Sequence, residues 1–261
     1  MEGLGRAPNK IDRGISLIIY SDPGIGKTTL AGTLPVGETL IINTEAGIGP
    51  LLGSGHYLFN VGQAVINTKL GLEKVMSDLY QKIRTRSLDC DDLTVKNVVI
   101  DNVSELIDQL TIFYTEGRNK EFPEIKERGD AAYKLLEWVH NWRDLVDMGI
   151  NVVFNAWEFP YELRNTNGTV ITQTTPMVGQ KAAQRICGLV DVVGHLENNE
   201  KTDKRWIRFG PSRQYLTKTQ FQGLEAGEPP DLSLILNKLN AYNYEKEEIN
   251  DDDGLGQRKT S

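Results

Sequence analysis

The sequence has 261 residues, of which 39% are hydrophobic and 25% charged, a composition typical of a globular protein with one sizeable core. The formal net charge of −7 argues against a protein that is basic throughout, as many nucleic-acid-binding domains are. No run of about 18 apolar residues occurs, and the polar residues 1–13 lack the apolar core of a secretory signal. We therefore expect a cytoplasmic protein with no membrane partner.

The negative charge is concentrated near the C-terminus. Residues 245–253 hold six acids against the single base Lys246 and so contribute −5 of the net −7. The rest of the chain is only mildly acidic, which is compatible with a local basic surface. We expect a flexible N-terminus over residues 1–13, one domain over 14–243 and a disordered acidic tail over 244–261.

The cysteines and histidines show no metal-ligand spacing. Cys90 and Cys187 lie far apart without a CxxC pair, and we expect two reduced thiols. The histidines, His56, His140 and His195, are scattered along the chain, and we assign them no site.

Short apolar runs alternate with helical patterns along the first part of the chain. Strands are predicted at residues 15–20, 39–43, 98–101 and 150–154. Helices are predicted from Lys27 onward, at 72–86, at 104–114, and from a cap at Asp130 to a stop at Gly149, with a surface loop over 115–129. This alternation is the sign of parallel strands connected by helices.

Two hairpins are predicted toward the C-terminus. Residues 161–164 and 169–172 flank an Asn167-Gly168 turn, and strand 190–196 pairs with 205–209 across the polar turn 198–204. Short helices are expected at 180–187 and 231–242. The whole pattern predicts an α/β fold with a mainly parallel sheet flanked by helices, followed by β-hairpins.

A phosphate-binding motif follows the first predicted strand. The segment Ser21-Asp22-Pro23-Gly24-Ile25-Gly26-Lys27-Thr28-Thr29 fits the Walker A pattern G-x-x-x-x-G-K-[ST] from Gly26 onward, with Ser21 in place of the first glycine. In such a loop, backbone N–H groups surround the phosphates, and the helix that follows directs its positive end at them. The lysine can reach the β- and γ-phosphate oxygens, and the Thr28 hydroxyl can ligate Mg²⁺. We therefore expect ATP and Mg²⁺ as ligands.

Two acids are candidate partners of this loop. Asp101 ends the strand at 98–101, where the acid that holds Mg²⁺ belongs. Glu45 lies in the segment that directly follows the second strand and so faces the crevice at the carboxyl ends of the strands, where a carboxylate can polarise the attacking water. Asn155 and Glu158 follow the fourth strand, and Glu158 is the alternative for the catalytic role, or else a surface residue.

Together these elements resemble the RecA-like recombinase ATPases over residues 14–222. Members of that family carry a catalytic glutamate in an Asp-Thr-Glu-Gly-like segment, here Asn43-Thr44-Glu45-Ala46-Gly47 with Asn43 replacing the acid. More narrowly, the segments 130–134, 151–158 and 210–212 resemble small bacteriophage ATPases that anneal single strands. The resemblance implies a catalytic role for Lys218, which lies in Thr217-Lys218-Thr219-Gln220 where relatives have an Ala-Lys-Asp-Arg-like run; the missing arginine leaves a role across subunits open.

The resemblance also implies a function and partners. It predicts a DNA-stimulated ATPase that binds single-stranded DNA and promotes annealing or strand exchange in phage recombination, with other copies of itself and a single-strand-binding protein as partners. DNA would contact residues 158–185, where Arg164, Lys181 and Arg185 can neutralise phosphates and Tyr161 can stack on a base. An ordinary surface hairpin is the alternative for this segment.

Two other functions remain open at this stage. A P-loop kinase for a small molecule should show an arginine-rich lid, and Lys201, Lys204 and Arg205 do not form a convincing one. A module that binds nucleotide without hydrolysing it, and so mediates assembly, is compatible with Asn43 and Ser21. A GTPase is disfavoured because the sequence has no Asn-Lys-x-Asp guanine motif.

Overall fold

The computed structural model describes residues 12–45, 47–164, 168, 170–199, 202 and 204–242, with no side-chain description for residues 163 and 164. The predicted acidic tail and all but the last residues of the predicted N-terminal segment lie outside this part of the chain. No helix in the described part combines the length and apolar character that a membrane span needs.

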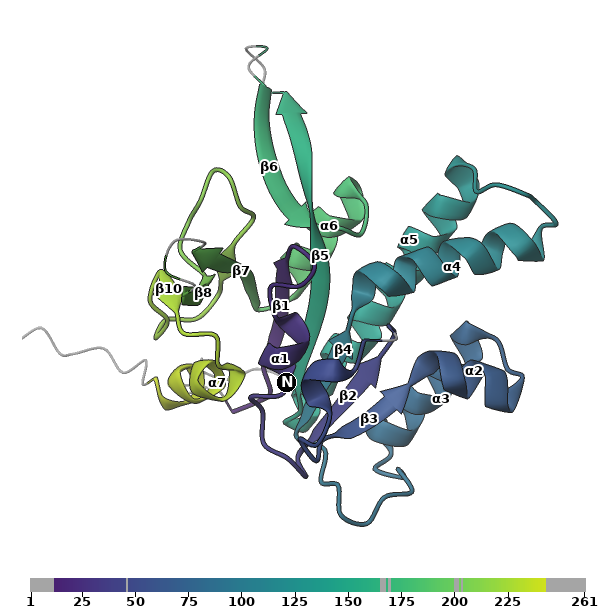
Figure 1. Cartoon of the computed structure of the whole chain (residues 1–261), viewed down its shortest axis with the longest axis horizontal. Coiled ribbons are helices and arrows are strands. Elements are labelled where there is room, and N and C mark those ends of the chain that lie inside the picture. The colour runs from purple at the N-terminus through teal and green to yellow at the C-terminus, as the bar shows by residue number, and fades with distance from the viewer. Residues whose placement is uncertain are drawn as a thin grey trace, which may run out of the picture.

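Ten strands and seven α-helices make up the described fold (Figure 1). The strands are β1 (Ser16–Ser21), β2 (Thr39–Asn43), β3 (Tyr57–Asn60), β4 (Asn97–Asp101), β5 (Asn151–Arg164), β6 (Val170–Pro176), β7 (Val192–Asn199), β8 (Lys204–Arg208), β9 (Lys218–Thr219) and β10 (Gly227–Glu228). The helices are α1 (Lys27–Ala31), α2 (Val61–Thr68), α3 (Leu72–Arg84), α4 (Val103–Gly117), α5 (Ile125–Arg143), α6 (Gln180–Leu189) and α7 (Leu232–Ala241), with 3-10 turns at Gly49–Leu51 and Asp144–Met148.

The central sheet is mainly parallel. Its order is β10-β8-β7-β1-β5-β4-β2-β3, and the six strands from β7 to β3 all run in the same direction. Strand β1, which leads into the Walker A loop, therefore lies in the middle, and β5 separates it from β4, which ends at Asp101. This arrangement confirms the predicted α/β fold and brings the carboxyl ends of β1, β2, β4 and β5 to one edge.

Helices cover both faces of the sheet because its central strands are apolar on both sides. Along β1, Ile18 and Tyr20 pack into a cluster with α3, α4, α5 and α6, whereas Leu17 and Ile19 pack into a second cluster with α1 and α7. All six residues of β1 are buried. A strand buried on both faces is typical of a parallel sheet, and it fixes the position of the loop that follows it.

Both predicted hairpins are confirmed. Strands β5 and β6 pair antiparallel from Glu158↔Pro176 to Arg164↔Val170, and β7 pairs with β8. Strand β5 is much longer than predicted: it passes through the sheet and then continues outward, so that the β5–β6 hairpin projects from the body (Figure 1). The turn residues 165–167 lie outside the described part of the chain.

The loop predicted at 115–129 is shorter, covering only 118–124, and the predicted helix start at Asp130 is wrong. Helix α4 continues to Gly117, and α5 begins at Ile125 with a capping box formed by Glu124 and Glu127. Some of the charged residues that suggested a solvated loop are instead paired, since the buried Glu127 carboxylate accepts hydrogen bonds from Arg118 and Lys120. Strand β3 and helix α2 had no prediction.

Candidate functional site

The Walker A loop connects β1 to α1 and needs two of its glycines for conformation. Gly24 and Gly26 have φ angles of 82° and 113°, in the left-handed region that side chains with a Cβ rarely adopt. Ser21 instead ends β1 as a buried, extended residue, so its position does not require glycine. The departure from the motif at Ser21 is therefore compatible with the fold of the loop.

Lys27 is buried beneath this loop, with 6% of its surface exposed. Its ammonium donates to the carbonyl oxygens of Ser21 (3.0 Å) and Asp22 (2.9 Å) and to the Ser21 hydroxyl (3.0 Å). Burial lowers the pKa of Lys27 to about 8, although the nearby carboxylates of Asp101 and Glu45 act in the opposite direction. The ammonium thus has only neutral acceptors in direct contact, and phosphate oxygens would be stronger ones.

Thr28 and Asp101 meet at the start of α1. The Thr28 hydroxyl donates to one Asp101 carboxylate oxygen at 2.6 Å, and the side-chain amide of Asn155 donates to the other at 3.0 Å. A hydroxyl and a carboxylate oxygen that converge in this way are the hard ligands that Mg²⁺ prefers. The residues present therefore fit a magnesium ion, which Thr28 and Asp101 would hold.

Two buried amides beside this pair have unused hydrogen-bonding capacity. Within the described residues, the Asn43 side-chain nitrogen and the Asn155 side-chain oxygen are buried without a hydrogen-bond partner. Asn43 is directly paired with Asp101 across β2 and β4. Buried polar atoms are nearly always paired in folded proteins, so these two atoms favour a polar ligand at this edge, such as a phosphate or the water shell of a cation.

Glu45 is held next to Asp101 by the backbone on either side. The Thr44 N–H donates to the Asp101 carbonyl (2.9 Å), and the Asn102 N–H donates to the Thr44 hydroxyl (2.7 Å). The Asn102 side-chain amide then donates to the Glu45 carboxylate. Burial and the charge of Asp101 raise the pKa of Glu45, while Lys27 acts in the opposite direction. A carboxyl group with a raised pKa is suited to accept a proton from water.

Comparison with known proteins decides the family. A family model described as an AAA domain matches residues 13–221. The chain belongs to this family. It is therefore a P-loop ATPase, as the Walker A motif predicted. No curated protein matches the chain. Among solved structures, it is similar to the flagellar accessory protein FlaH from Methanocaldococcus jannaschii, with 12% identity over 76% of this chain and 78% of that one and a TM-score of 0.39.

Glu158, the alternative catalytic acid of this AAA-domain ATPase, is engaged elsewhere. Its carboxylate lies 2.6 Å from Nε2 of His195, and Nδ1 of the same ring lies 3.3 Å from Glu197. The imidazole also stacks on Tyr215, with ring centroids 3.9 Å apart. We assigned His195 no site from the sequence, yet it is paired in register with Tyr20, one residue before the Walker A segment. Only strand pairing reveals this, because no local motif surrounds His195.

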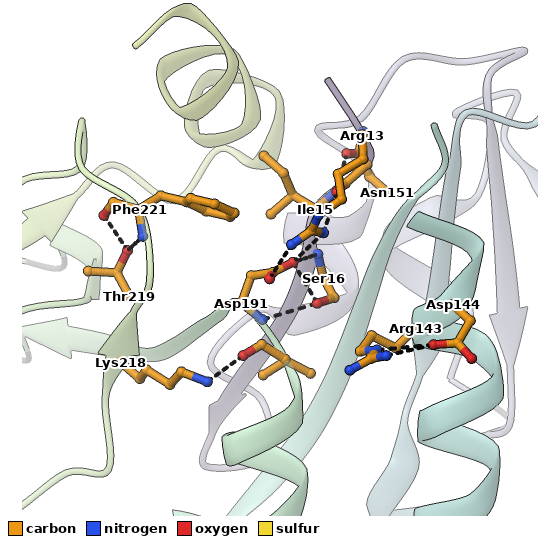
Figure 2. Close-up of polar contacts among 12 residues, drawn as sticks. Arg13, Ile15, Ser16, Arg143, Asp144, Asn151, Asp191, Lys218, Thr219 and Phe221 are labelled. Carbon is orange, nitrogen blue, oxygen red and sulfur yellow. Dashed lines mark hydrogen bonds and ion pairs between the residues drawn. The ribbon is translucent and has the colours of Figure 1, made fainter. Parts of the chain in front are cut away.

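The structure does not bring Lys218 to the Walker A loop of its own chain. Its ammonium donates to the carbonyl oxygens of Cys187 (3.1 Å), Gly188 (2.8 Å) and Val190 (2.6 Å), at the C-terminal end of α6. Figure 2 shows one of these contacts. Those carbonyls precede β7, at the edge of the sheet opposite the Walker A loop. In this position Lys218 caps a helix.

The residues predicted to contact DNA lie on the projecting hairpin and at its foot. Lys181 and Arg185 are exposed one turn apart on α6, which packs against β6. The Tyr161 ring lies 4.8 Å from that of Phe159, which is 43% exposed and which the sequence did not single out. Arg164 ends β5, and its side chain lies outside the described part.

Proposed function

We propose that this ATPase binds ATP with Mg²⁺, hydrolyses it, and couples the reaction to the binding of single-stranded DNA. Lys27 would contact the β- and γ-phosphate oxygens, and Thr28 and Asp101 would hold the ion. When bound, Mg²⁺ neutralises charge on the phosphates. Glu45 accepts a proton from the attacking water, whose oxygen bonds to the γ-phosphorus as the bond to the leaving ADP oxygen breaks.

Strand β5 connects the proposed nucleotide site with the proposed DNA site. Within the sheet, Asn155 on this strand donates to the Asp101 carboxylate, so one of its side chains lies at the proposed magnesium site. Three residues later Glu158 starts the pairing with β6, and the same strand continues into the projecting hairpin. A change in ligand at Asp101 therefore has a direct path along one strand to the hairpin.

The chemistry of the hairpin and its foot suits a single strand of nucleic acid. The exposed basic side chains of Lys181 and Arg185 on α6 can neutralise phosphates, and neither forms an ion pair within the described residues. The exposed ring of Phe159 offers a surface on which a base can stack. Aromatic faces beside cations are the usual composition of sites that bind single strands without sequence preference.

The biological task proposed for this activity is annealing or strand exchange during bacteriophage recombination. The proposed task rests on the resemblance of the sequence to small bacteriophage recombination ATPases. It implies that several copies of the chain assemble on DNA and that a single-strand-binding protein is a further partner.

Measurement of ATP hydrolysis with and without single-stranded DNA tests the proposal. We expect the DNA to stimulate hydrolysis, and the double variant Lys181→Gln, Arg185→Gln to lose most of that stimulation while it keeps the DNA-free rate. Lys82→Gln, Arg84→Gln makes the same charge change on α3, away from the hairpin (Figure 1), and should respond to DNA as the parent does.

The other outcomes separate the alternatives. Phosphate transfer to a small molecule in place of hydrolysis would favour a kinase. Nucleotide binding without any turnover would favour an assembly module. A hydrolysis rate that does not change on addition of single-stranded DNA would contradict the proposed coupling to DNA binding. The ATP hydrolysis itself would still stand.

A further inference from the structure

Strand β8 brings an arginine against the Walker A loop. A Cβ atom on Gly26 would lie 2.8 Å from a terminal nitrogen of Arg205 and 3.7 Å from its central guanidinium carbon. Gly26 is the residue immediately before Lys27, and it caps the start of α1. The antiparallel pairing of β7 and β8, with Asn198 opposite Arg205, fixes the position of this arginine.

The guanidinium of Arg205 has no neutralising partner within the described residues. The side chain is exposed, and no carboxylate there forms an ion pair or hydrogen bond with it. Arg208, on the same strand, shows the contrast, because its guanidinium donates two hydrogen bonds to the Glu197 carboxylate. A free guanidinium beside a loop built to surround phosphates is a second cation available to the same anion.

We propose that Arg205 binds the phosphates of the nucleotide from the same chain, as a partner of Lys27. The inference rests on the nucleotide binding proposed above and adds a residue outside the Walker A motif. A guanidinium offers several donors in a planar fork that matches phosphate oxygens, which a single ammonium cannot do. Lys27 is buried and bonded to neutral acceptors, whereas Arg205 is exposed beside Gly26 and adds a second positive charge at the loop.

The position of Arg205 also bears on specificity. Its guanidinium lies beside Gly26, whose backbone lies next to the β-phosphate in a Walker A motif. Arg205 should therefore recognise the phosphate chain, whatever the base. This commits the inference to a probe that has phosphates and neither base nor ribose.

Binding of ATP and of inorganic tripolyphosphate, each with Mg²⁺, tests the inference by calorimetry. We expect Arg205→Gln to weaken the binding of both ligands by a similar factor, about tenfold or more for a charge-assisted contact. Arg205→Lys should restore part of the loss. The matched control is Lys204→Gln, which removes the same charge from the adjacent exposed residue, whose side chain points to the other face of the strand, and should bind within about twofold of the parent.

Each other result has a defined consequence. Parental binding of tripolyphosphate by Arg205→Gln, or an equal loss in Lys204→Gln, would overturn the inference while leaving the nucleotide function in place. Weaker binding of ATP alone would also overturn it, since the contact would then involve the base or ribose. Failure of the parent protein to bind either ligand would overturn the nucleotide function and this inference together.

Discussion

Buried charged and polar residues meet at both edges of the parallel sheet, where the parallel strands begin and where they end. The two groups differ in how fully they are hydrogen-bonded. At the edge away from the Walker A loop, the Asp191 carboxylate accepts hydrogen bonds from both terminal nitrogens of Arg13 (2.8 and 3.1 Å) and from the N–H and hydroxyl of Ser16 (2.9 and 2.8 Å) (Figure 2). The Asp191 N–H in turn donates to the Ser16 hydroxyl. The hydrogen-bonded carboxylate of Asp191 thus connects β1, β7 and the chain before β1 at this edge.

At the nucleotide edge, by contrast, the buried cation Lys27 has only neutral acceptors, and two buried amides are left short of hydrogen-bond partners. Burial disfavours the charged form of Lys27 and lowers its pKa, and the amides of Asn43 and Asn155 each keep an unpaired atom. Burial also opposes the charged form of Asp191, but the hydrogen bonds from Arg13 and Ser16 outweigh it and hold that pKa below its usual range. A saturated polar cluster stabilises the fold, whereas a cluster that keeps unpaired polar atoms is prepared for a ligand.

The largest expected effect is at Lys27. Lys27→Ala should lower ATP hydrolysis by about 100-fold or more, since the phosphates lose their buried cation. The thermal unfolding midpoint should stay the same or rise, because the substitution removes a charge that burial disfavours. Steady-state hydrolysis and calorimetric melting measure the two quantities. A variant that hydrolyses ATP at the parental rate would show that the loop is not the phosphate site.

The next effect separates binding from turnover at the same edge. Glu45→Gln should keep nucleotide affinity within a few-fold but reduce turnover by about 100-fold, the loss typical of a missing general base. A carboxamide preserves the size of the side chain and its contact with Asn102 but cannot accept the proton. If turnover stays within about twofold of the parent, the role moves to Glu158, and Glu158→Gln is the matched variant.

The nucleotide edge was largely predictable from the sequence because its residues sit in short local patterns. The Walker A segment is contiguous, Asp101 follows an apolar run directly and Glu45 lies three residues after one, so strand ends alone place them at one edge. The clamp of Asn102 on Glu45 and the unpaired amide atoms could not be predicted, since they depend on the register of β2 against β4.

The opposite edge gave no such signal. Asp191 and Ser16 are 175 positions apart and meet only because β7 pairs with β1. Lys218 was assigned to catalysis through a resemblance in a short run, whereas strand β9 brings it to the end of α6. The same limitation hid the positions of His195 and Arg205, which reach the nucleotide edge through β7 and β8. To predict contacts between neighbouring strands, one must know the order of the strands in the sheet. No short pattern in a single sequence gives that order.

The third effect tests the saturated edge. Asp191→Asn should destabilise the protein by about 2 kcal/mol, since hydrogen bonds to a charged group are weakened and Arg13 loses its partner. The folded-state pKa of Asp191 is lowered, so the ionised carboxylate stabilises the fold at pH values above its unfolded-state pKa of about 3.9. This stabilisation is lost as the pH falls through the folded-state pKa. Urea unfolding at pH 7 and at pH 3 should therefore show a difference from the parent that shrinks in acid. An unchanged ATP affinity is the control, and a stability equal to the parent's at pH 7 would contradict the structural role.

The fourth effect is a pH dependence at the nucleotide edge. In the free protein Lys27 loses its proton above a pKa of about 8, while bound phosphates favour the charged form, so binding above that pH takes up a proton. ATP affinity should therefore be constant below pH 8 and fall by up to about tenfold for each pH unit above it. Calorimetry between pH 7 and 9.5, in buffers of different ionisation enthalpy, measures both the affinity and the proton uptake. Residual binding by Lys27→Ala should lack this dependence, and an affinity of the parent that stays constant to pH 9.5 would contradict it.

The smallest effect concerns Lys218 and decides between its two roles. Lys218→Met keeps the length of the side chain but removes the donors to three carbonyl oxygens at the end of α6, so we expect a loss of about 1 kcal/mol in stability. Burial lowers the pKa of this lysine, which fits a side chain that lies along the helix end and is not fully solvated. Lys181→Met, which removes the same charge from the exposed start of α6, should leave stability unchanged. Without DNA, hydrolysis per folded molecule should equal the parental rate in both variants at every protein concentration, because neither ammonium reaches the Walker A loop of its own chain. If Lys218→Met instead lost about tenfold in turnover at concentrations where the chain assembles, with its melting midpoint intact, the lysine would serve a neighbouring copy, and the cap on α6 would be only its resting contact.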